Sequence, residues 1–561
     1  MFTYYSYCYI IVATMYVDSS TVRRGDKVYT RHLLRESFRH EGKVKHRTLA
    51  NLSSCSAEEV EAIRLALSHK HSLANLGSIK ESVKLCQGRS VGAVAVLLEL
   101  AKQVGLVSAL GSERDGSLAL WQVMARVIDQ GSRLSATRLA RSHAVPELLG
   151  LSFNENDLYA NLDWLSEHQS EIENRLFRKE AGGLFLYDVT SSYLEGECNE
   201  LAAFGYNRDG KRGKRQIVVG LLCNSKGQPL CIEVVEGNTQ DPKTFVSQVK
   251  KVSERFGGSG EITFVGDRGM IKSGQIEALG EKGFHYITAI TKPQIERLLG
   301  EGVLQMSLFD DALAEVQNEG VRYILRRNPL RAQEMTDSRK ERLDTLLKAT
   351  DERNVYLTEH PRAKPGVALN WLNGRAQKLG IKSCVSIELK ERQIVLVQDE
   401  AAILEQARLD GCYAMKTDLP VECASKEEVH TRYKDLAQVE WAFRTAKTTH
   451  LEMRPLYVRL ATRTRGHALV VMLAYRLVQE LANRWNSVDL TVQEGIDLLA
   501  KLCLVEVQVN GQAPFAKIPE PDTETAELLR LAKIQLPSAL AAPKKGNVST
   551  KNKLQKQRKA R

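Results

Sequence analysis

Two aspartates in this chain follow short apolar runs that are typical of buried β-strands. Asp188 comes near the end of the run that begins at Leu184, and Asp267 follows the run at 262–265. A carboxylate at the end of a strand buried on both faces reaches the sheet edge where ligands bind. Two such carboxylates on neighbouring strands repel each other, and a divalent cation allows both to stay ionised. Hard oxygen ligands of this kind favour Mg²⁺ or Mn²⁺.

A third carboxylate, Glu440, lies in a segment with helical periodicity, from residue 426 to about residue 448. At about 100° per residue, Tyr433, Arg444 and Lys447 fall within about 40° of Glu440 around that helix. One stripe therefore carries an aromatic hydroxyl, a carboxylate, a guanidinium and an ammonium group. An ordinary surface ion pair between Glu440 and Arg444 is the alternative for this helix taken alone, and it would contribute only a few tenths of a kcal/mol.

The elements predicted between residues 182 and 294 have the order needed to position these groups. Strands are predicted at 184–189, 215–223, 229–235, 262–265 and 284–290, and helices at 243–256 and 273–282. Asp241 precedes Pro242 at the start of the first of these helices, so capping is the favoured explanation for Asp241. Three strands joined by short turns, then helix, strand, helix and strand, is the element order of an RNase H-like α/β fold.

Three sequence blocks resemble the DDE transposases of bacterial insertion sequences, in the IS-four-like branch. The blocks are Asp188-Val-Thr-Ser-Ser, Gly266-Asp267-Arg-Gly-Met and Tyr433-x2-Leu436-x3-Glu440-x6-Lys447. The third block matches the signature Tyr-x2-Arg-x3-Glu-x6-Lys except at Leu436. The resemblance covers roughly residues 182–480 and includes Gly237-Asn238-Thr-Gln-Asp241, Asp410-Gly411, Phe443-Arg444, Arg454-Pro455 and Gly466-His467. Of these, His467 is interpreted as structural.

The resemblance implies an enzyme that cuts transposon ends and transfers them to a target DNA. Asp188, Asp267 and Glu440 would be its catalytic and metal-binding residues, with Mg²⁺ as cofactor and Mn²⁺ possible. Asp188 would bridge two ions about 3.5–4 Å apart, and each of the other two carboxylates would complete one ion. Phosphates close to the cut would be bound by Tyr433, Arg444 and Lys447.

The same resemblance implies the partners and the location. The partners are double-stranded DNA, as terminal inverted repeats and as target, and a second copy of the chain in a homodimer. The location is the bacterial cytoplasm, in association with the nucleoid. Two alternatives stay open: an RNase H-like nuclease without strand transfer, and an inactive DNA-binding regulator of a mobile element. The presence of all three carboxylates argues against the inactive regulator.

Six regions are expected along the chain. They are a small β-rich region (1–57), a helical, DNA-binding domain (58–181), the first part of the core (182–294), a β-rich insertion (295–420), the second part of the core with the catalytic helix (421–505) and a C-terminal extension with a disordered basic tail (506–561). Short β-prone runs between residues 16 and 52 predict an antiparallel sheet with basic residues on one face. In the helical region, 118–128 and 135–142 fit either a helix-turn-helix or a plain bundle, with Arg126, Arg133, Arg138 and Arg141 near phosphates or in solvent.

Composition excludes several other classes of protein. The ten cysteines are scattered without a Cys-x-x-Cys pair, which argues against a zinc ribbon or a disulfide framework and fits a reducing cytosol. The sequence contains no run of about 18 apolar residues, so no membrane-spanning helix is predicted. Residues 1–14 lack the basic segment of a signal peptide, and translation from Met1 and from Met15 are both compatible with the sequence. Eight of the net +11 charges lie between Pro543 and Arg561, which leaves +3 for the rest of the chain.

The basic tail either binds DNA or has no defined partner, and truncation after Ala542 separates the two. If the tail contacts phosphates, the truncated protein will show a shallower dependence of DNA affinity on salt concentration, because fewer counterions are released on binding. An unchanged slope in a salt titration of DNA binding would exclude the tail as a DNA contact.

Overall fold

The computed structural model describes residues 14–24, 27–40, 43–70, 83–178, 183–196, 198–206, 208, 210–211, 213–256, 262–447, 451, 453, 456–509, 515–537 and 540. Its contacts divide the chain into two compact units, and each is described by itself. One unit contains residues up to Gly88 together with Leu504–Pro519; the other contains Arg89–Cys503 and Glu520–Pro537. The basic tail and the pair Arg454-Pro455 lie outside the described residues.

The first unit begins with the small antiparallel sheet that the sequence predicts. Its strands are β1 (Thr14–Arg24), β2 (Lys27–His40) and β3 (Lys43–Asn51), followed by helix α1 (Ala57–Ser68). The expected single basic face is wrong. Arg35 and Arg39 lie on one face of β2, whereas Glu36, on the other face, pairs with Arg47 of β3 at 2.6 Å. Successive side chains of a strand alternate between faces, so basic residues at both odd and even positions are divided between them.

A second small sheet has the order β16-β15-β4 and joins segments far apart in the chain. Its strands are β4 (Val83–Ser90), β15 (Cys503–Val509) and β16 (Phe515–Lys517). The stretch that contains β4 was expected to be helical. Its partner lies near the opposite end of the sequence, and no local periodicity indicates such a pairing.

The second unit is built around an eight-stranded mixed sheet in the order β10-β11-β14-β9-β8-β5-β6-β7. Five of its strands are β5 (Leu184–Tyr193), β6 (Gln216–Asn224), β7 (Pro229–Glu236), β8 (Thr263–Gly266) and β9 (His285–Ala289). Strand β6 runs antiparallel to both β5 and β7, whereas β8 is parallel to β5 and β9 is parallel to β8. The helices α10 (Asp241–Phe256) and α11 (Ser273–Gly280) occur between them in the predicted order.

Apolar side chains are buried against both faces of this sheet. Along β5, Phe185 and Tyr187 are fully buried in a cluster that includes Phe245 of α10. Leu186, between them, points to the other face and belongs to the cluster that contains α17 (Leu436–Lys447) and α18 (Ala461–Arg484). Because both faces are buried, β5 reads as a nearly continuous apolar run up to Asp188.

Seven helices between residues 92 and 177 pack in the same unit. They are α3 (Gly92–Gln103), α4 (Leu106–Leu110), α5 (Arg114–Ile128), α6 (Arg133–Ser142), α7 (Val145–Leu149), α8 (Glu155–Glu167) and α9 (Gln169–Phe177). A single helix was expected over 157–177; instead it breaks at His168. Gly466 of α18 allows close contact with α8, because a Cβ at this position would lie 2.1 Å from the Leu162 carbonyl oxygen. Among the described helices, none has both the length and the apolar character that crossing a bilayer requires.

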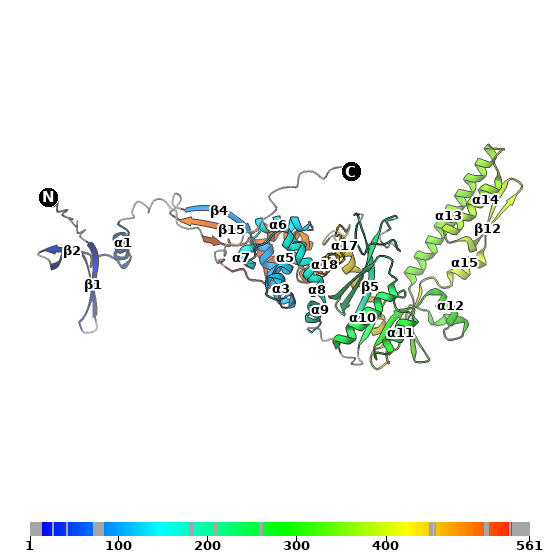
Figure 1. Ribbon diagram of the computed structural model, residues 1–561, viewed down its shortest axis with the longest axis horizontal. Helices are drawn as coiled ribbons and strands as arrows, with labels where there is room; N and C mark the ends of the chain where they lie inside the picture. Colours follow the sequence, from blue (N-terminus) through cyan, green and yellow to red (C-terminus); the bar gives the residue numbers. More distant parts are fainter. Residues whose placement is uncertain are drawn as a thin grey trace, which may run out of the picture. The chain divides into compact units, whose positions relative to one another are not determined.

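The segment expected to be a β-rich insertion contains both helices and strands. Its elements are α12 (Lys292–Gly300), β10 (Ala314–Asn318), β11 (Val321–Arg327), α13 (Pro329–Glu359), α14 (Pro365–Lys378), β12 (Val385–Lys390), β13 (Gln393–Gln398), α15 (Glu400–Ala407) and β14 (Cys412–Thr417). Three of its strands, β10, β11 and β14, extend the main sheet beside β9. The 31-residue helix α13, with α14 and the β12-β13 hairpin, encloses an apolar core of its own (Figure 1).

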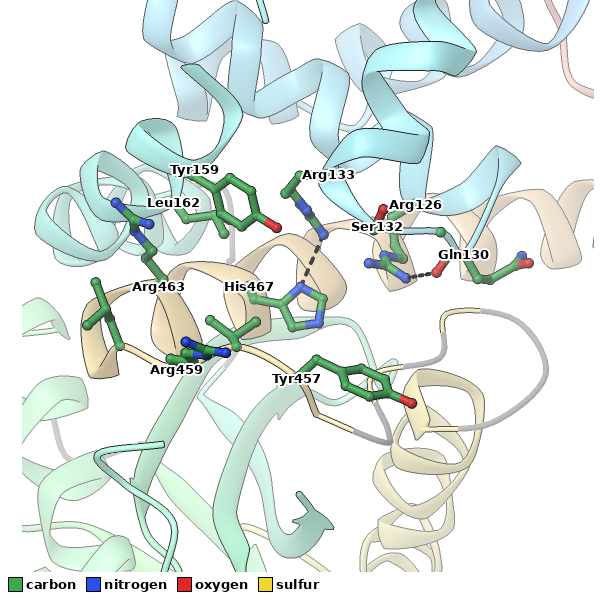
Figure 2. Close-up of a pocket in the computed structure, with 13 residues that line it drawn as sticks. Arg126, Gln130, Ser132, Arg133, Tyr159, Leu162, Tyr457, Arg459, Arg463 and His467 are labelled. Carbon is green, nitrogen blue, oxygen red and sulfur yellow. Dashed lines mark hydrogen bonds between the residues drawn. The ribbon is translucent and has the colours of Figure 1, made fainter. Parts of the chain in front are cut away.

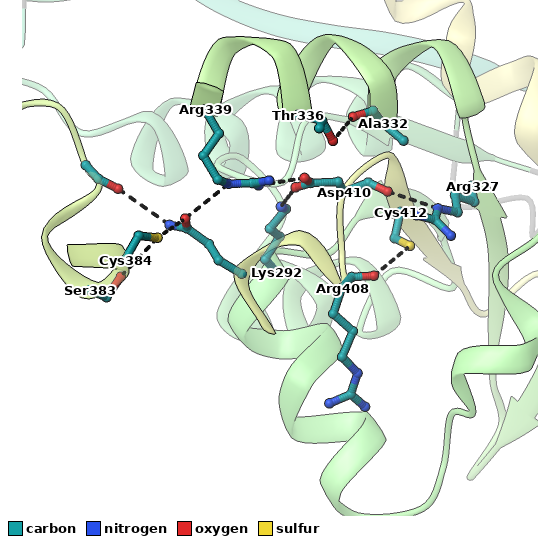
Figure 3. Close-up of polar contacts among 12 residues, drawn as sticks. Lys292, Arg327, Ala332, Thr336, Arg339, Ser383, Cys384, Arg408, Asp410 and Cys412 are labelled. Atoms are coloured by element: carbon teal, nitrogen blue, oxygen red, sulfur yellow. Dashed lines mark hydrogen bonds and ion pairs between the residues drawn. The ribbon is translucent and has the colours of Figure 1, made fainter. Parts of the chain in front are cut away.

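Asp410 connects α13 with the elements beside the sheet (Figure 3). Its side chain is almost fully buried, and one carboxylate oxygen lies 2.6 Å from Nη2 of Arg339 on α13. The other oxygen lies 3.6 Å from Nζ of Lys292, at the start of α12. Gly411 has a φ of +71°, and a Cβ there would lie 2.3 Å from the Asn328 carbonyl oxygen. The Asp410-Gly411 pair therefore has a structural explanation.

We predict that Asp410→Ala destabilises the second unit by about 3–5 kcal/mol, because it leaves the buried Arg339 guanidinium without its carboxylate. Urea denaturation followed by circular dichroism measures the change. Asp344→Ala on the exposed side of α13 is the matched control, with an expected change within about 0.5 kcal/mol. Equal stability of the two variants would contradict the role of Asp410 as an anchor.

Candidate active site

Asp188 and Asp267 lie at matching positions of two adjacent parallel strands. Tyr187 of β5 is in register with Gly266 of β8, so each aspartate stands one residue beyond this pair. Adjacent strands are about 4.8 Å apart, so the two aspartates lie side by side although they are far apart in the sequence. Asp188 is half-buried and Asp267 is exposed. Asp267 follows the end of β8 as predicted, whereas the expected strand-end position is wrong for Asp188, which lies in the middle of β5 because that strand continues to Tyr193.

The pKa of Asp188 is raised to about 7. Burial is the largest cause, because it penalises the charged form of the carboxyl group. The backbone N–H of Val189 donates a 2.7 Å hydrogen bond to Asp188 Oδ1 and acts in the opposite direction. The negative charges of Asp267 and Glu440 raise the pKa further. Both of the other predicted carboxylates therefore act electrostatically on Asp188.

Glu440 is presented by α17, which packs on the sheet face that includes Leu186. Val439 and Phe443 are buried in this interface, and Glu440 is exposed beside them. A cavity of about 390 Å³ lies between the strand and the helix. Its polar lining residues are Asp188, Thr190, Arg208, Glu440, Arg444 and Lys447. Four of the six residues expected to form the site therefore line one cavity.

The long helix expected over residues 426–448 is two helices. The first, α16 (Lys426–Lys434), ends before Asp435, whose carbonyl oxygen accepts a hydrogen bond from Gln438 N–H at 2.9 Å. The Asp435 carboxylate also accepts a 3.3 Å hydrogen bond from the Gln438 side chain. Asp followed three residues later by Gln is typical of a helix N-terminus, and this signal could have located the break.

Tyr433 precedes this break. Its hydroxyl donates a 3.2 Å hydrogen bond to Asp267 Oδ1. Burial, followed by the neighbouring charges of Asp267 and Glu440, raises the pKa of Tyr433, so that its hydroxyl keeps its proton at neutral pH. Tyr433 therefore lies at the Asp267 side of the site, whereas Arg444 and Lys447 lie at the Asp188 side with Glu440.

Three cationic side chains line the cavity, and one of them was missed by the sequence reasoning. Arg444 is exposed and lies over the ring of Trp441, 5.9 Å from its centroid, whereas Lys447 is buried. The third is Arg208, whose positive charge lowers the pKa of Asp188 and whose backbone N–H donates to Ser191 Oγ at 3.0 Å. The cluster of basic residues between two predicted strands, 208–215, was the available signal.

The donor set consists of carboxylates, whose oxygens suit a hard divalent cation. The like charges of Asp267 and Glu440 also raise the pKa of Asp188, and a bound cation would offset them. Within the described residues, no three His, Cys, Asp or Glu side chains are grouped to hold a single metal ion. Asp188 is the carboxylate on which both Asp267 and Glu440 act.

Two family models match the chain. The model described as "Transposase DDE domain" matches residues 181–477, and the one described as "IS1634 family transposase, N-terminal domain" matches residues 17–82. A search of curated proteins finds no match. Among solved structures, the chain is similar to a piggyBac transposase synaptic complex with hairpin DNA determined by cryo-electron microscopy. The two are 9% identical, with a TM-score of 0.34, over 75% of this chain and 70% of that one.

We predict that Asp188→Asn stabilises the metal-free protein above pH 7. A carboxyl group whose pKa is raised by folding destabilises the folded state progressively as the pH increases from its unfolded value to about 7. The difference in melting temperature between the variant and the wild type will therefore grow from pH 4 to about pH 7 and then level off. A difference that is independent of pH, measured in EDTA, would contradict the environment described for Asp188.

Proposed function

This chain belongs to the DDE transposases of insertion sequences, and on that premise we propose that Asp188, Asp267 and Glu440 are its catalytic and metal-binding residues. The observation that carries the proposal is the register of β5 and β8, which places Asp188 and Asp267 side by side. The influence of both Asp267 and Glu440 on the pKa of Asp188 supports it independently. The strand order β7-β6-β5-β8-β9 supports an RNase H-like core, interrupted between β9 and α16 by the segment that contains α13 and α14.

The cofactor proposed for this site is Mg²⁺, with Mn²⁺ as a substitute. Asp188 and Asp267 would hold one ion, and Asp188 and Glu440 a second. When bound, the ions activate the attacking oxygen and stabilise charge on the leaving oxygen. These ions would offset the charges of Asp267 and Glu440, both of which raise the pKa of Asp188.

The chain's own cations position the DNA strand around these carboxylates. Arg208, Arg444 and Lys447 line the cavity with Asp188 and supply donors for phosphate oxygens. Tyr433 keeps its proton and lies at Asp267, where it orients that carboxylate and donates no charge. Such contacts fix the position of the strand without specifying a base.

The proposed reaction has two steps with the same geometry. In the first, water attacks a phosphodiester phosphorus at the transposon end, the bond to the 3′-oxygen breaks, and a 3′-hydroxyl and a 5′-phosphate result. In the second, that 3′-hydroxyl attacks a target phosphodiester, its proton passes to solvent, and the target 3′-oxygen leaves. Each step exchanges one P–O bond for another, so no oxidant and no covalent protein intermediate is needed.

The proposed partners are the terminal inverted repeats of the element and a target duplex. We propose that two copies of the chain act as a homodimer that holds two ends together, in the bacterial cytoplasm at the nucleoid.

We predict that Glu440→Gln abolishes end cleavage in Mg²⁺ or Mn²⁺ while changing DNA affinity less than about threefold, because the substitution removes a metal ligand but no phosphate contact. Gel assays of cleavage and of binding on the same labelled transposon end measure both quantities. Glu427→Gln, an exposed acid on α16, is the matched control and should cleave normally. Cleavage by Glu440→Gln at the wild-type rate would refute the assignment.

Strand transfer distinguishes a transposase mechanism from simple nuclease action at this site. Ends that are supplied already cut, with free 3′-hydroxyls, will be joined to a target plasmid by the wild-type protein and not by Glu440→Gln. Cleavage without any joining would favour the nuclease alternative.

A further inference from the structure

A second polar cavity lies in the same unit, outside the carboxylate site. Its volume is about 530 Å³. One wall consists of the end of α5 and the start of α6, with Arg126, Ser132 and Arg133; another consists of α8, with Tyr159 (Figure 2). The remaining wall is the segment 457–460 and the first turns of α18, with Arg459, Arg463 and His467.

The lining of this cavity is strongly cationic. Four arginines face it, and the described residues that line it include no aspartate or glutamate. Arg463 is neutralised by Asp163, at 2.9 Å. Arg459, by contrast, is exposed and has no ion-pair partner within the described ranges. Arg459 therefore brings positive charge to the cavity that no described carboxylate balances.

Arg133 is the most unusual of these residues, because its guanidinium is buried without a carboxylate. It donates to the side-chain oxygen of Gln122, and its Nη2 lies 3.3 Å from Nδ1 of His467 (Figure 2). Both partners are neutral, since burial and the nearby Arg126 and Arg133 charges hold the pKa of His467 well below its usual range. Burial, with Arg126 close by, lowers the pKa of Arg133 to about 9. The desolvation cost of the buried Arg133 guanidinium is therefore not offset by a carboxylate.

The backbone at the start of α6 adds to the positive electrostatic potential of the cavity. Gly131, Ser132 and Arg133 line the cavity at the N-terminus of the ten-residue helix α6, whose dipole places partial positive charge there. The Ser132 side chain is already used as an N-cap, accepting from Ser135 N–H at 3.2 Å. The cavity thus combines a helix N-terminus with a buried guanidinium, and both favour an anion.

The cavity is connected to the strand that carries Asp188. Leu456 N–H donates to the Tyr193 carbonyl oxygen at 3.0 Å, and Glu195 N–H donates to the Leu456 carbonyl oxygen at 3.3 Å. The wall 457–460 therefore begins next to the end of β5, one residue after Leu456. Asp188 lies six residues before Leu194 on this path, which corresponds to about 20 Å of extended chain. That separation spans several nucleotides of a DNA strand at about 3.4 Å per step.

We propose that this cavity is a phosphate-binding site for the DNA backbone, several nucleotides from the bond that the carboxylates cut. The proposal rests on the proposed function only in taking DNA as the ligand. Arg133 and Arg459 are the residues that bind the phosphate oxygens, in the charge-assisted geometry that guanidinium groups favour. The site also explains the helical region near α5 and α6: two of the arginines expected on its surface, Arg126 and Arg133, are buried and face this cavity.

The test is a salt titration of DNA binding by the full chain without divalent metal, so that its outcome does not depend on Asp188, Asp267 or Glu440. The probe is a fluorescent duplex of random sequence, because phosphate contacts carry no sequence information. Arg459→Gln and Arg133→Gln should each weaken binding about tenfold and reduce the slope of log affinity against log salt by about one. Arg138→Gln, an exposed arginine of α6 outside the cavity, is the matched control and should keep the wild-type slope.

A parallel measurement distinguishes DNA from free phosphate. If inorganic phosphate raises the melting temperature of the wild type and not of Arg459→Gln, while the DNA slopes of both are equal, the assignment to DNA is overturned. Wild-type slopes in both cavity variants, with no effect of inorganic phosphate, would overturn the site itself. Arg459 is exposed, so its variant decides the matter even if Arg133→Gln fails to fold.

Discussion

The burial of one carboxylate beside two others is the constraint on which the candidate site depends. Asp188 lies next to Asp267 on adjacent strands, and Glu440 approaches from the helix packed on one face of the sheet. Burial is the largest cause of the raised pKa of Asp188, and the charges of Asp267 and Glu440 add to it. A divalent cation would offset these charges.

The cationic side chains of the second unit form two groups. Arg208, Arg444 and Lys447 stand beside the carboxylates, while Arg133 and Arg459 line a separate cavity reached along the continuation of β5. Asp163 neutralises Arg463 of the second cavity, whereas Arg459 has no ion-pair partner within the described residues. A polyanionic strand running between the two cavities would satisfy both, which gives the helical region a role in holding DNA without requiring a helix-turn-helix.

Several motif residues of the family act through packing. Gly466 permits the contact between α18 and α8, and Gly411 occupies a positive-φ position beside α13. Asp410 binds Arg339 and so attaches the outer helices to the sheet. Leu436, where the family signature has arginine, is buried in the core under α17. Motif residues that line the candidate site and motif residues that pack therefore alternate along the same stretch of chain, and only their contacts distinguish them.

The sequence by itself determined the order of strands and helices from β5 to β9, because apolar runs bounded by turns are local signals, and it selected the carboxylates from motif spacing. It indicated helices at 336–349 and 399–408 between β11 and β14, but it did not determine the full length of α13, the presence of α14, the break at Asp435, the pairing of β4 with β15, or the membership of Arg208 in the site. Those features depend on contacts between residues far apart in the chain, and local sequence periodicity does not indicate such contacts. The tertiary structure also decided that Arg126 and Arg133 face a buried cavity rather than solvent, since burial is a property of the packed helices together.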